Sequence, residues 1–507
     1  MGKSTKDKKE TKRSAKTAGP LPEDKYAVNS LSDLNAENLK NVIMKNRYAQ
    51  MLIALTVIGF ILRFYNLGFN SLWLDEASTL GFAERSLSGI WDATASGEFN
   101  PPLFYYMEHF IIGTGVSEFT LRFIPALLGA LTVPVFYLLG REVSGKAGGV
   151  VAAALVAFSS FHIFYSQEAR AYAPMLFFFS IALISYLYAM RGSGTKWWAL
   201  FGLFSALAFW THFYVFIAIG ILIFHALIVK REEIVKNATE NLKPLAIALG
   251  IFIFASLPLI VVTVGLFFKR TASEPTWGLS GLDVINQTIL MISGSSILPL
   301  AVLIVLALCG LYAVWRSDRS MLLLLVLSLV LPFIVSMLLS TKIPMSPRYM
   351  IYLIPFYFMA ISGCLLLVPK GIDMKKVAVV FIAVIFIINL PALAGYYTSY
   401  SKNDWRGFAV ALEQTTKDGD AIVVLPGYMS QPLDYYYSSE ADETTEYKIN
   451  NGDQLKEAVS EIGNNTAYYI VTWDISAADP EGGALEWLNE NADYLGQYMG
   501  IFLFKTN

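Results

Sequence analysis

The chain has 507 residues, of which 55% are hydrophobic and only 15% are charged. Apolar runs of about 20 residues recur along it and the mean hydropathy is +0.50, so an ordinary soluble domain is excluded and a polytopic membrane protein is indicated. The formal net charge of −2 provides no basic footprint for nucleic acid, and we expect no nucleic-acid partner.

The N-terminal segment, residues 1–46, is polar and rich in lysine at its start. It contains no apolar stretch of the kind found in a signal peptide. We therefore expect a basic cytoplasmic tail, followed by a short polar or interfacial helix over residues 33–45.

Residues 47–396 predict a bundle of about eleven membrane-spanning helices. Lysine and arginine are concentrated in alternate connections, which predicts a cytoplasmic N-terminus and an extracytoplasmic C-terminus. We expect a multi-pass protein of the cell membrane, in contact with the lipid bilayer. The expected spans are 48–66, 119–140, 148–166, 172–190, 197–211, 213–229, 244–267, 297–315, 320–340, 348–368 and 376–396.

Two regions lie outside the spans on the predicted outer side. The first outer loop, 67–118, contains aromatic stretches that predict short helices in the interface. The C-terminal region, 397–507, alternates between strand-like and helix-like stretches, which predicts a small soluble α/β domain. Its expected strands are 421–425, 468–472 and 500–504, and its expected helices are 405–415, 454–462 and 484–489.

Several polar groups fall at the predicted outer ends of spans, far apart in sequence but on one face of the membrane. Ionisable groups at such depth are costly and often mark a working site. A transporter would tend to place them near the middle of the membrane on broken helices, so this arrangement favours a site at the outer interface. The groups are Asp75-Glu76, Gln167-Glu168-Ala169-Arg170, Thr211-His212, Lys269-Arg270 and Pro347-Arg348-Tyr349.

A membrane enzyme with an outer site has no access to cytosolic nucleotide sugars, so a lipid-linked phosphate would be its sugar donor. Transfer requires a carboxylate that takes the proton of the acceptor hydroxyl, and Asp75 and Glu76 are the candidates. It also requires positive charge that meets the departing phosphate. The candidates for that task are Arg170, Arg348, Lys269 and Arg270.

Each candidate also has a purely structural interpretation. Asp75 and Glu76 could be solvated loop acids just outside the bilayer. Glu168 and Arg170 could pair with each other, and Lys269-Arg270 could be a solvated turn. His212 could be a hydrogen-bonded residue at a helix end, and Arg348-Tyr349 could be an interfacial anchor.

A series of short motifs follows one another along residues 50–360. They are Trp73-Leu-Asp75-Glu76, Asn100-Pro-Pro-Leu-Phe-Tyr-Tyr106, Leu121-Arg122-Phe-Ile-Pro-Ala-Leu-Leu-Gly129, Gly140-Arg141, Ser166-Gln-Glu-Ala-Arg-Ala-Tyr172, Thr211-His-Phe-Tyr214 and Arg348-Tyr-Met-Ile-Tyr-Leu-Ile-Pro355. In this order they resemble the GT-C membrane glycosyltransferases of the protein O-mannosyltransferase and lipid A aminoarabinose transferase superfamily. The branch they resemble most is the prokaryotic one that is similar to dolichyl-phosphate-mannose-protein mannosyltransferases.

The resemblance implies an inverting transfer of a sugar, mannose-like or other, from a polyprenyl or dolichyl phosphate to a protein, lipid or glycan acceptor. It implies a GT-C module over residues 47–396, mainly α, with the α/β domain appended. It further implies that Asp75 is the catalytic base and that Glu168 and Arg170 belong to the site. Four residues within the matching motifs are expected to shape the site: Glu168, Tyr172, Tyr349 and Arg122.

Some proteins of this superfamily hold a divalent metal ion at the site. Here Phe99-Asn100 stands where an acid would be sought, so Glu98 and His212 are the nearest candidate ligands for one such ion. The alternative function is a polytopic transporter or flippase of lipid-linked glycans, which would predict pseudo-symmetric halves with polar residues at mid-span. A third is a scaffold that displays the C-terminal domain.

Overall fold

The computed structural model describes residues 36–272, 274–275, 277–399, 401–439 and 443–506. The basic tail predicted at the start of the segment 1–46 lies outside them. Two compact units make up the chain, Met1–Ile53 and Ala54–Asn507. Helix α1 covers Ala36–Lys45, at the place of the expected polar helix, and α2 covers Arg47–Phe64.

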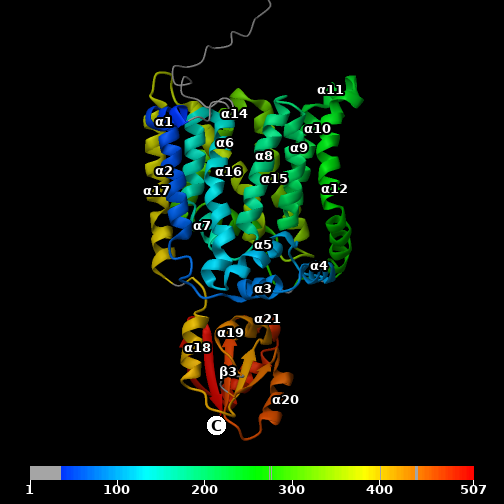
Figure 1. Cartoon of the computed structure of the whole chain (residues 1–507), viewed down its shortest axis with the longest axis vertical. Helices are drawn as coiled ribbons and strands as arrows, with labels where there is room; N and C mark the ends of the chain where they lie inside the picture. Colours follow the sequence, from blue (N-terminus) through cyan, green and yellow to red (C-terminus); the bar gives the residue numbers. More distant parts are fainter. Residues whose placement is uncertain (1–35, 273, 276, 400, 440–442, 507) are drawn as a thin grey trace, which may run out of the picture. The chain divides into compact units, whose positions relative to one another are not determined.

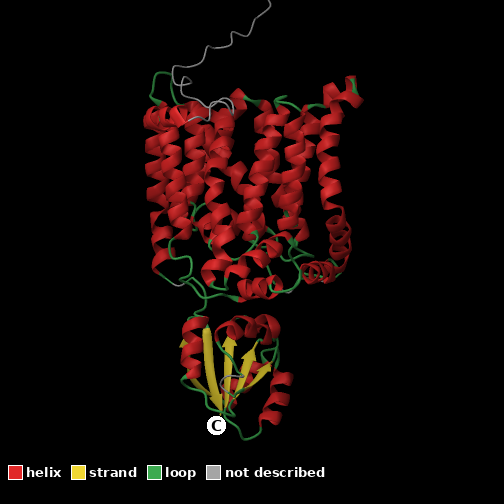
Figure 2. Ribbon diagram, viewed as in Figure 1, coloured by secondary structure: helices red, strands yellow, loops and turns green. Residues whose placement is uncertain are grey.

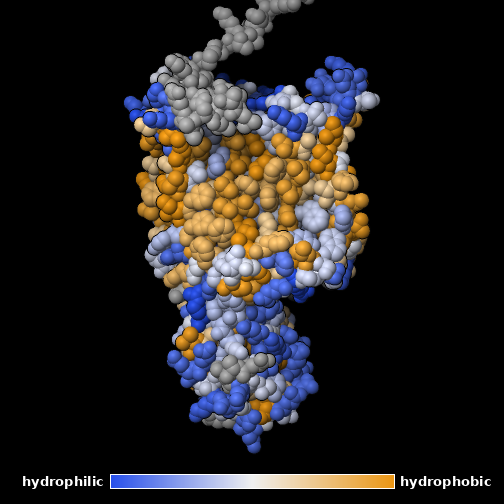
Figure 3. Space-filling model, in the orientation of Figure 1, coloured by the Kyte–Doolittle hydropathy of each residue, from blue (hydrophilic) through white to orange (hydrophobic). Residues whose placement is uncertain are grey.

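Long apolar helices form most of the chain, because a helix satisfies its own backbone hydrogen-bonding groups in a bilayer. Among the described residues, eight helical segments are long and apolar enough to cross a membrane. Figure 3 shows their apolar side chains gathered in a band, and the chain is a multi-pass membrane protein. The segments are α2, α6 (Glu118–Phe158), α8 (Tyr172–Met190), α12 (Ala238–Arg270), α14 (Ile297–Ser317), α15 (Arg319–Leu339), the continuous run of η4 (Pro347–Leu353), α16 (Ile354–Gly363) and η5 (Cys364–Leu367), and α17 (Met374–Thr398).

Helix α6 contains one complete predicted span and most of a second. The two are separated at Ser144 and Gly145, where the backbone leaves the helical conformation. Gly145 has a φ of 72°, which glycine adopts without steric cost. The two halves then pack back against each other, since a Cβ added to Gly140 would clash with the carbonyl oxygen of Gly148. Helix α6 is therefore a helical hairpin.

Two other predicted spans are short helices in the structure, and the span 148–166 is interrupted. Helices α9 (Thr195–Thr211) and α10 (Val215–Val229) have 17 and 15 residues and meet at the predicted polar break. The predicted span 148–166 is split where the Ser159 side chain caps α7 (Ser160–Ser166) by accepting a hydrogen bond from His162. The count of eleven spans stays a prediction.

The long first loop folds into short helices at the end of the bundle that faces the C-terminal domain (Figure 1). Helix α3 covers Leu74–Ala83, α4 covers Leu87–Ser96, and α5 (Leu103–Ile111) continues into the turn η3 (Ile112–Thr114). The short helices expected in this loop are present. Two other short helices, α11 (Arg231–Lys236) and α13 (Leu282–Ile292), lie in later connections.

The C-terminal domain is a five-stranded mixed sheet with helices on both faces (Figure 2). Its strand order is β2-β1-β3-β5-β4, in which β1 is parallel to β2 and β3, and β5 is antiparallel to β3 and β4. The strands are β1 (Ala421–Leu425), β2 (Thr445–Lys448), β3 (Ala467–Thr472), β4 (Asp493–Tyr498) and β5 (Ile501–Thr506). The α/β class is as predicted.

Each face of this sheet has its own apolar core. Helices α20 (Gly452–Ile462) and α22 (Gly483–Asn491) pack on one face. Helices α18 (Trp405–Glu413) and α19 (Ser430–Tyr436) pack on the other, and the turns η6 (Gly427–Met429) and α21 (Ile475–Ala478) complete the layers. Helix α19 also packs against α3, so this second face is turned toward the membrane bundle.

Candidate active site

The loop before α3 is held by Arg122, near the start of α6. Its guanidinium donates hydrogen bonds to the carbonyl oxygens of Leu67 (2.9 Å), Asn70 (2.8 Å) and Ser71 (3.0 Å). These bonds satisfy carbonyls that an irregular loop cannot pair with itself. They fix the approach to the first turn of α3, which contains Asp75-Glu76 and where the helix dipole favours acidic groups.

Glu76 is fully buried and fully paired. Arg122 donates to both carboxylate oxygens, at 2.8 and 2.7 Å, the Lys402 ammonium lies 3.0 Å from Oε2, and the backbone N–H of Ala169 donates to Oε1 at 2.9 Å. Burial alone would raise the pKa of Glu76, but the two cations outweigh it and lower the pKa to about 2. Such a carboxylate is a poor proton acceptor, so the geometry favours Asp75 over Glu76 as the base.

Asp75 lies between two arginines from distant parts of the chain. Its Oδ2 is 3.8 Å from Nε of Arg170 and 3.3 Å from Nη1 of Arg348. Arg170 also donates to the carbonyl oxygen of Asp75 (3.2 Å) and to the hydroxyl of Thr79 (3.3 Å). The Asp75 side chain is 22% exposed, whereas that of Glu76 is 0% exposed. The structure thus brings together the predicted base and two of the predicted phosphate-binding groups.

Glu168 is a third carboxylate of this cluster, and it does not form the ion pair with Arg170 that a purely structural interpretation of the motif predicts. Its side chain is fully buried, and neither carboxylate oxygen has a hydrogen-bond partner in the described part of the chain. Burial raises the pKa of Glu168 to about 7, against the opposing positive charge of Lys402. A proton is therefore readily gained or lost here near neutral pH.

Aromatic rings surround Arg348, which is therefore part of the cluster rather than a simple interfacial anchor. Its guanidinium carbon lies 5.7 Å from the ring centroid of Trp73, 5.9 Å from Tyr172 and 5.5 Å from Tyr349, within cation–π range. The rings of Tyr172 and Tyr349 also each lie 5.5 Å from that of His212. Tyr172 and Tyr349 therefore lie next to Arg348 and His212, and their role in shaping the site stays a prediction.

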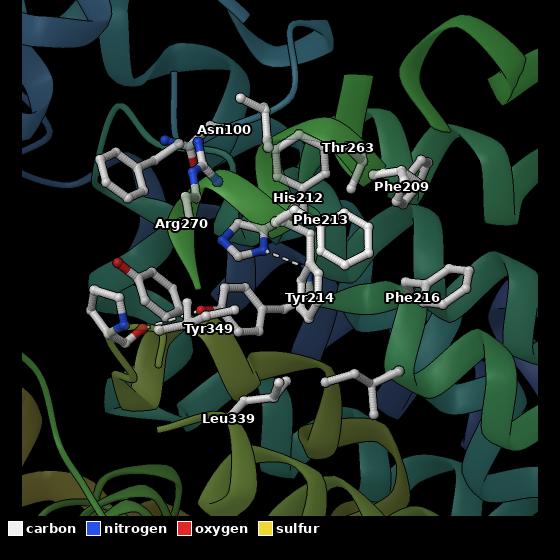
Figure 4. A pocket seen from close by; sticks show the side chains of 18 of the residues that line it. Asn100, Phe209, His212, Phe213, Tyr214, Phe216, Thr263, Arg270, Leu339 and Tyr349 are labelled. Carbon is white, nitrogen blue, oxygen red and sulfur yellow. Dashed lines mark hydrogen bonds between the residues drawn. The ribbon is translucent and has the colours of Figure 1, made fainter. Parts of the chain in front are cut away.

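A cavity of about 480 Å³ lies beside this cluster (Figure 4). Arg170 links the two, because it contacts Asp75 and also lines the cavity with His212, Arg270 and Tyr349. Apolar walls with a few convergent polar groups are typical of a ligand site. The apolar side chains are Phe99, Phe209, Phe213, Phe216, Ile217, Ile260, Val264, Leu266, Phe267, Phe268, Trp277, Leu339, Ile343 and Pro344.

Of the two basic residues that end α12, Arg270 lines the cavity and Lys269 does not. Nη2 of Arg270 donates to the carbonyl oxygens of Gly97 (3.0 Å) and Glu98 (2.6 Å), and its guanidinium lies 4.4 Å from the ring centroid of Phe99. Arg270 therefore holds the turn after α4 against α12. Lys269 is exposed, so its predicted phosphate-binding role has no support from its position.

The candidate metal ligands Glu98 and His212 are engaged elsewhere. Oε1 of Glu98 accepts hydrogen bonds from the Tyr105 hydroxyl (2.7 Å) and the Asn100 amide (3.1 Å). Nδ1 of His212 accepts one from the backbone N–H of Tyr214 (3.4 Å), drawn as a dashed line in Figure 4. No group of three or more His, Cys, Asp or Glu side chains among the described residues could hold a metal ion. These donors do not fit a divalent ion, so the expected metal at Glu98 and His212 has only the sequence in its favour.

Lys402 is the residue of the cluster that sequence reasoning does not find. It lies in the connection between α17 and α18, in the polar stretch Ser401-Lys402-Asn403-Asp404. Nothing in that stretch distinguishes it from an ordinary solvated lysine. Only its contact with Glu76 reveals that it belongs to the site.

Two sequence comparisons bear on this arrangement. The family model described as dolichyl-phosphate-mannose-protein mannosyltransferase matches residues 100–260. An uncharacterised protein of Aquifex aeolicus (strain VF5) is 32% identical over 141 residues, which are 25% of this chain and 27% of that protein. The chain thus spans little more than a quarter of this relative's length.

Solved structures match nearly the whole chain. ArnT from Cupriavidus metallidurans in the apo state gives a TM-score of 0.59 at 13% identity, over 89% of this chain and 97% of ArnT. The apo oligosaccharyltransferase of Archaeoglobus fulgidus gives 0.54 at 15% identity, over 92% of this chain and 75% of that protein. The chain has the GT-C fold.

ArnT bound to undecaprenyl phosphate also matches, with a TM-score of 0.53 at 12% identity over 89% of this chain and 97% of that one. The GT-C fold confirms the predicted fold class. In this GT-C chain, the start of α3 and the connection between α7 and α8 meet through the contacts of Glu76 with Ala169 and of Asp75 with Arg170.

Proposed function

We propose that this GT-C protein transfers a sugar from a lipid-linked phosphate donor to a hydroxyl acceptor. The transfer takes place on the side of the membrane where α3 lies. The observation that carries the proposal is the position of Asp75 between Arg170 and Arg348, with Arg170 also lining an apolar cavity. The mannosyltransferase family match and the likeness to ArnT, whose structure is known with undecaprenyl phosphate, support a lipid-linked donor.

The cavity and the arginines suit the two ends of such a donor. Its aromatic and aliphatic walls are suited to the hydrocarbon chain next to the phosphate. Guanidinium groups bind phosphate through paired hydrogen bonds, so Arg170 and Arg348 are the proposed phosphate ligands, and Arg270 is a further cation that lines the cavity. The donor class is a polyprenyl or dolichyl phosphate sugar.

In the proposed cycle, Asp75 neutralises Arg170 and Arg348 until the donor phosphate competes for these guanidinium groups. The Asp75 carboxylate is then free to take the proton of the acceptor hydroxyl. The acceptor oxygen forms its bond to the anomeric carbon while the bond from that carbon to the phosphate oxygen breaks. The electron pair leaves with the lipid phosphate, whose new charge the arginines stabilise. Attack from the face opposite the phosphate inverts the anomeric centre.

The proposed topology places α3 and the C-terminal domain outside the cytoplasm. The distribution of lysine and arginine supports it, because positively charged connections remain on the cytoplasmic side. Reporter fusions after Lys146, Lys196 and Lys376 should be cytoplasmic, and a fusion at the C-terminal end should be extracytoplasmic. A cytoplasmic C-terminal domain would separate the site from a donor exposed on the outer leaflet.

The decisive experiment compares Asp75→Asn with Asp92→Asn, an acid on α4 that serves as the matched control. Asparagine keeps the shape of Asp75 but cannot take the proton, so turnover with polyprenyl-phosphate sugars should fall by about 10²–10⁴. Wild-type turnover in Asp75→Asn would refute the role of the base. Movement of lipid-linked glycans across vesicles by wild-type protein, without sugar transfer, would favour the flippase instead.

A further inference from the structure

The connection between α17 and α18 runs along the loop that precedes α3. The backbone N–H of Ser401 donates to Oδ1 of Asn70 at 3.0 Å. The hydroxyl of Ser71 donates to Oδ1 of Asp404, also at 3.0 Å. The first residues of the C-terminal region are therefore joined directly to the segment that leads into the site.

Lys402 lies between these two contacts and is buried. Lysine side chains are rarely buried unless a group of opposite charge pairs with them. Its side chain is only 7% exposed, and its ammonium is 3.0 Å from Oε2 of Glu76. The ammonium also lies 5.7 Å from the ring centroid of Trp73 and 5.9 Å from that of Phe164. Burial lowers the pKa of Lys402, so the attraction to Glu76 offsets the cost of desolvating the ammonium only in part.

The charge of Lys402 gives the cluster an excess of positive charge. Glu76 already has a partner in Arg122, so the charge of Lys402 is additional. Lys402 also acts on Glu168, which has no hydrogen-bond partner among the described residues and whose pKa this ammonium lowers. An additional cation next to Glu76 and Glu168 suits a cluster that receives an anionic ligand such as a phosphate.

The C-terminal domain contacts the same loop independently. The Tyr436 hydroxyl of α19 donates to Glu118 at 2.7 Å and accepts the backbone N–H of Leu72 at 2.8 Å. Arg406 of α18 pairs with Glu118 and donates to the carbonyl oxygen of Gly68 at 3.1 Å. The loop is thus held by α6 on one side and by the C-terminal domain on the other.

We propose that the C-terminal domain completes the active site, with Lys402 as a positioning residue that holds the Asp75-Glu76 segment and supplies positive charge next to the donor phosphate, a proposal that rests on the glycosyl transfer described above. The C-terminal domain, which follows the last membrane helix in the chain, then forms part of the reaction centre. Its docking onto the loop before α3 sets the rate of turnover.

The test compares Lys402→Met and Lys402→Arg in the full-length protein, with Lys417→Met, an exposed lysine of the same domain, as the matched control. Methionine keeps the apolar stem but removes the charge, so kcat should fall by about tenfold or more, with a smaller change in donor KM. Lys402→Arg should recover part of kcat, and Lys417→Met should match the wild type.

The pH profile distinguishes this role from a loss of folded protein. The ammonium faces Glu76, Glu168 and Arg122, and it lowers the pKa of both carboxylates. Lys402→Met should therefore raise the pKa of Glu168 further and move the part of the kcat/KM profile near pH 7 to higher pH, whereas a smaller folded fraction would scale the profile without moving it. A wild-type kcat and an unmoved profile in Lys402→Met would overturn the proposal.

A second pair of variants tests the docking itself. Arg406→Glu opposes Glu118 and should lower turnover, and adding Glu118→Arg should recover part of it by restoring opposite charges. No recovery in the double variant, together with wild-type turnover in Lys402→Met, would show that the domain does not contribute. If Asp75→Asn still abolishes transfer in that case, only the role of the C-terminal domain fails and the proposed function stands.

Discussion

The Glu76–Arg122 ion pair offers a direct test of what the second acid of α3 does. Replacing Glu76 by Gln keeps the size of the side chain but removes the negative charge that Arg122 and Lys402 share. A glutamine can accept at one oxygen only, and its amide group would face the guanidinium donor to donor. Two cations would then be buried without their common partner.

The expected loss of stability is large. Removing one partner of a buried ion pair typically costs about 3–5 kcal/mol, because the remaining charge stays desolvated. Here the carboxylate also accepts the backbone N–H of Ala169, so the connection that contains Arg170 loses one anchor as well. We therefore expect Glu76→Gln to lower the thermal midpoint of the purified protein in detergent by several degrees.

The assay compares thermal unfolding and turnover of Glu76→Gln with those of Glu84→Gln, an exposed acid just beyond the end of α3. Glu84→Gln should behave as the wild type in both. Glu76→Gln should lose stability, and its turnover should fall because Asp75 is no longer held in place. A wild-type midpoint combined with abolished turnover would mean that Glu76 takes part in the chemistry, and its structural role would be wrong.

Four further outcomes are expected. Arg170→Lys should recover only part of the turnover that Arg170→Ala loses, because a point charge cannot replace the planar fork; equal turnover in the two would contradict a phosphate contact. The raised pKa of Glu168, from 4.5 to about 7, stabilises the folded state below pH 4.5, and about 3 kcal/mol should be lost as pH rises to 7. Unfolding measured across that range should lose this part of its pH dependence in Glu168→Gln, and an unaltered dependence would count against a buried, unpaired acid. Gly310→Ala should lower the thermal midpoint, because its Cβ would clash with the carbonyl oxygen of Ala360; a normal midpoint would argue against the close packing of α14 on α16. Chelation of divalent ions should leave turnover unchanged, whereas a loss that one added ion reverses would establish the metal site.

The sequence predicts those parts of the fold that depend on long apolar periods. The hairpin of α6 and the break between α9 and α10 were accessible, because Gly145 and Thr211-His212 interrupt apolar runs. Strands β2 and β4 were not, because their side chains are mostly exposed and lack an apolar alternation. Their place at the edges of the sheet depends on pairing with β1 and β5, which a local pattern does not encode.

Apart from Lys402, the members of the site can be predicted from the sequence, but their pairing cannot. Asp75, Arg170 and Arg348 could be placed on one membrane face from topology, yet the sequence cannot decide which carboxylate stays available. That distinction follows from Arg122, which binds both oxygens of Glu76 and leaves Asp75 to the other arginines. Lys402 is beyond local reasoning, because its environment is assembled from segments more than 300 residues apart.

The hairpin of α6 also sets a length constraint on the chemistry. Arg122 lies near the start of its first arm, and its second arm leads through α7 to Glu168 and Arg170, while the turn at Ser144 lies about 33 Å from Arg122 by helical rise. One residue inserted into the first arm would shift its end by about 1.5 Å and rotate it by about 100°. Such an insertion would turn Arg122 away from Glu76 without altering any residue of the site. The lengths of the two arms fix the position of Arg122 relative to the Glu168-Ala169-Arg170 segment. The site therefore depends on this spacing as well as on its side chains.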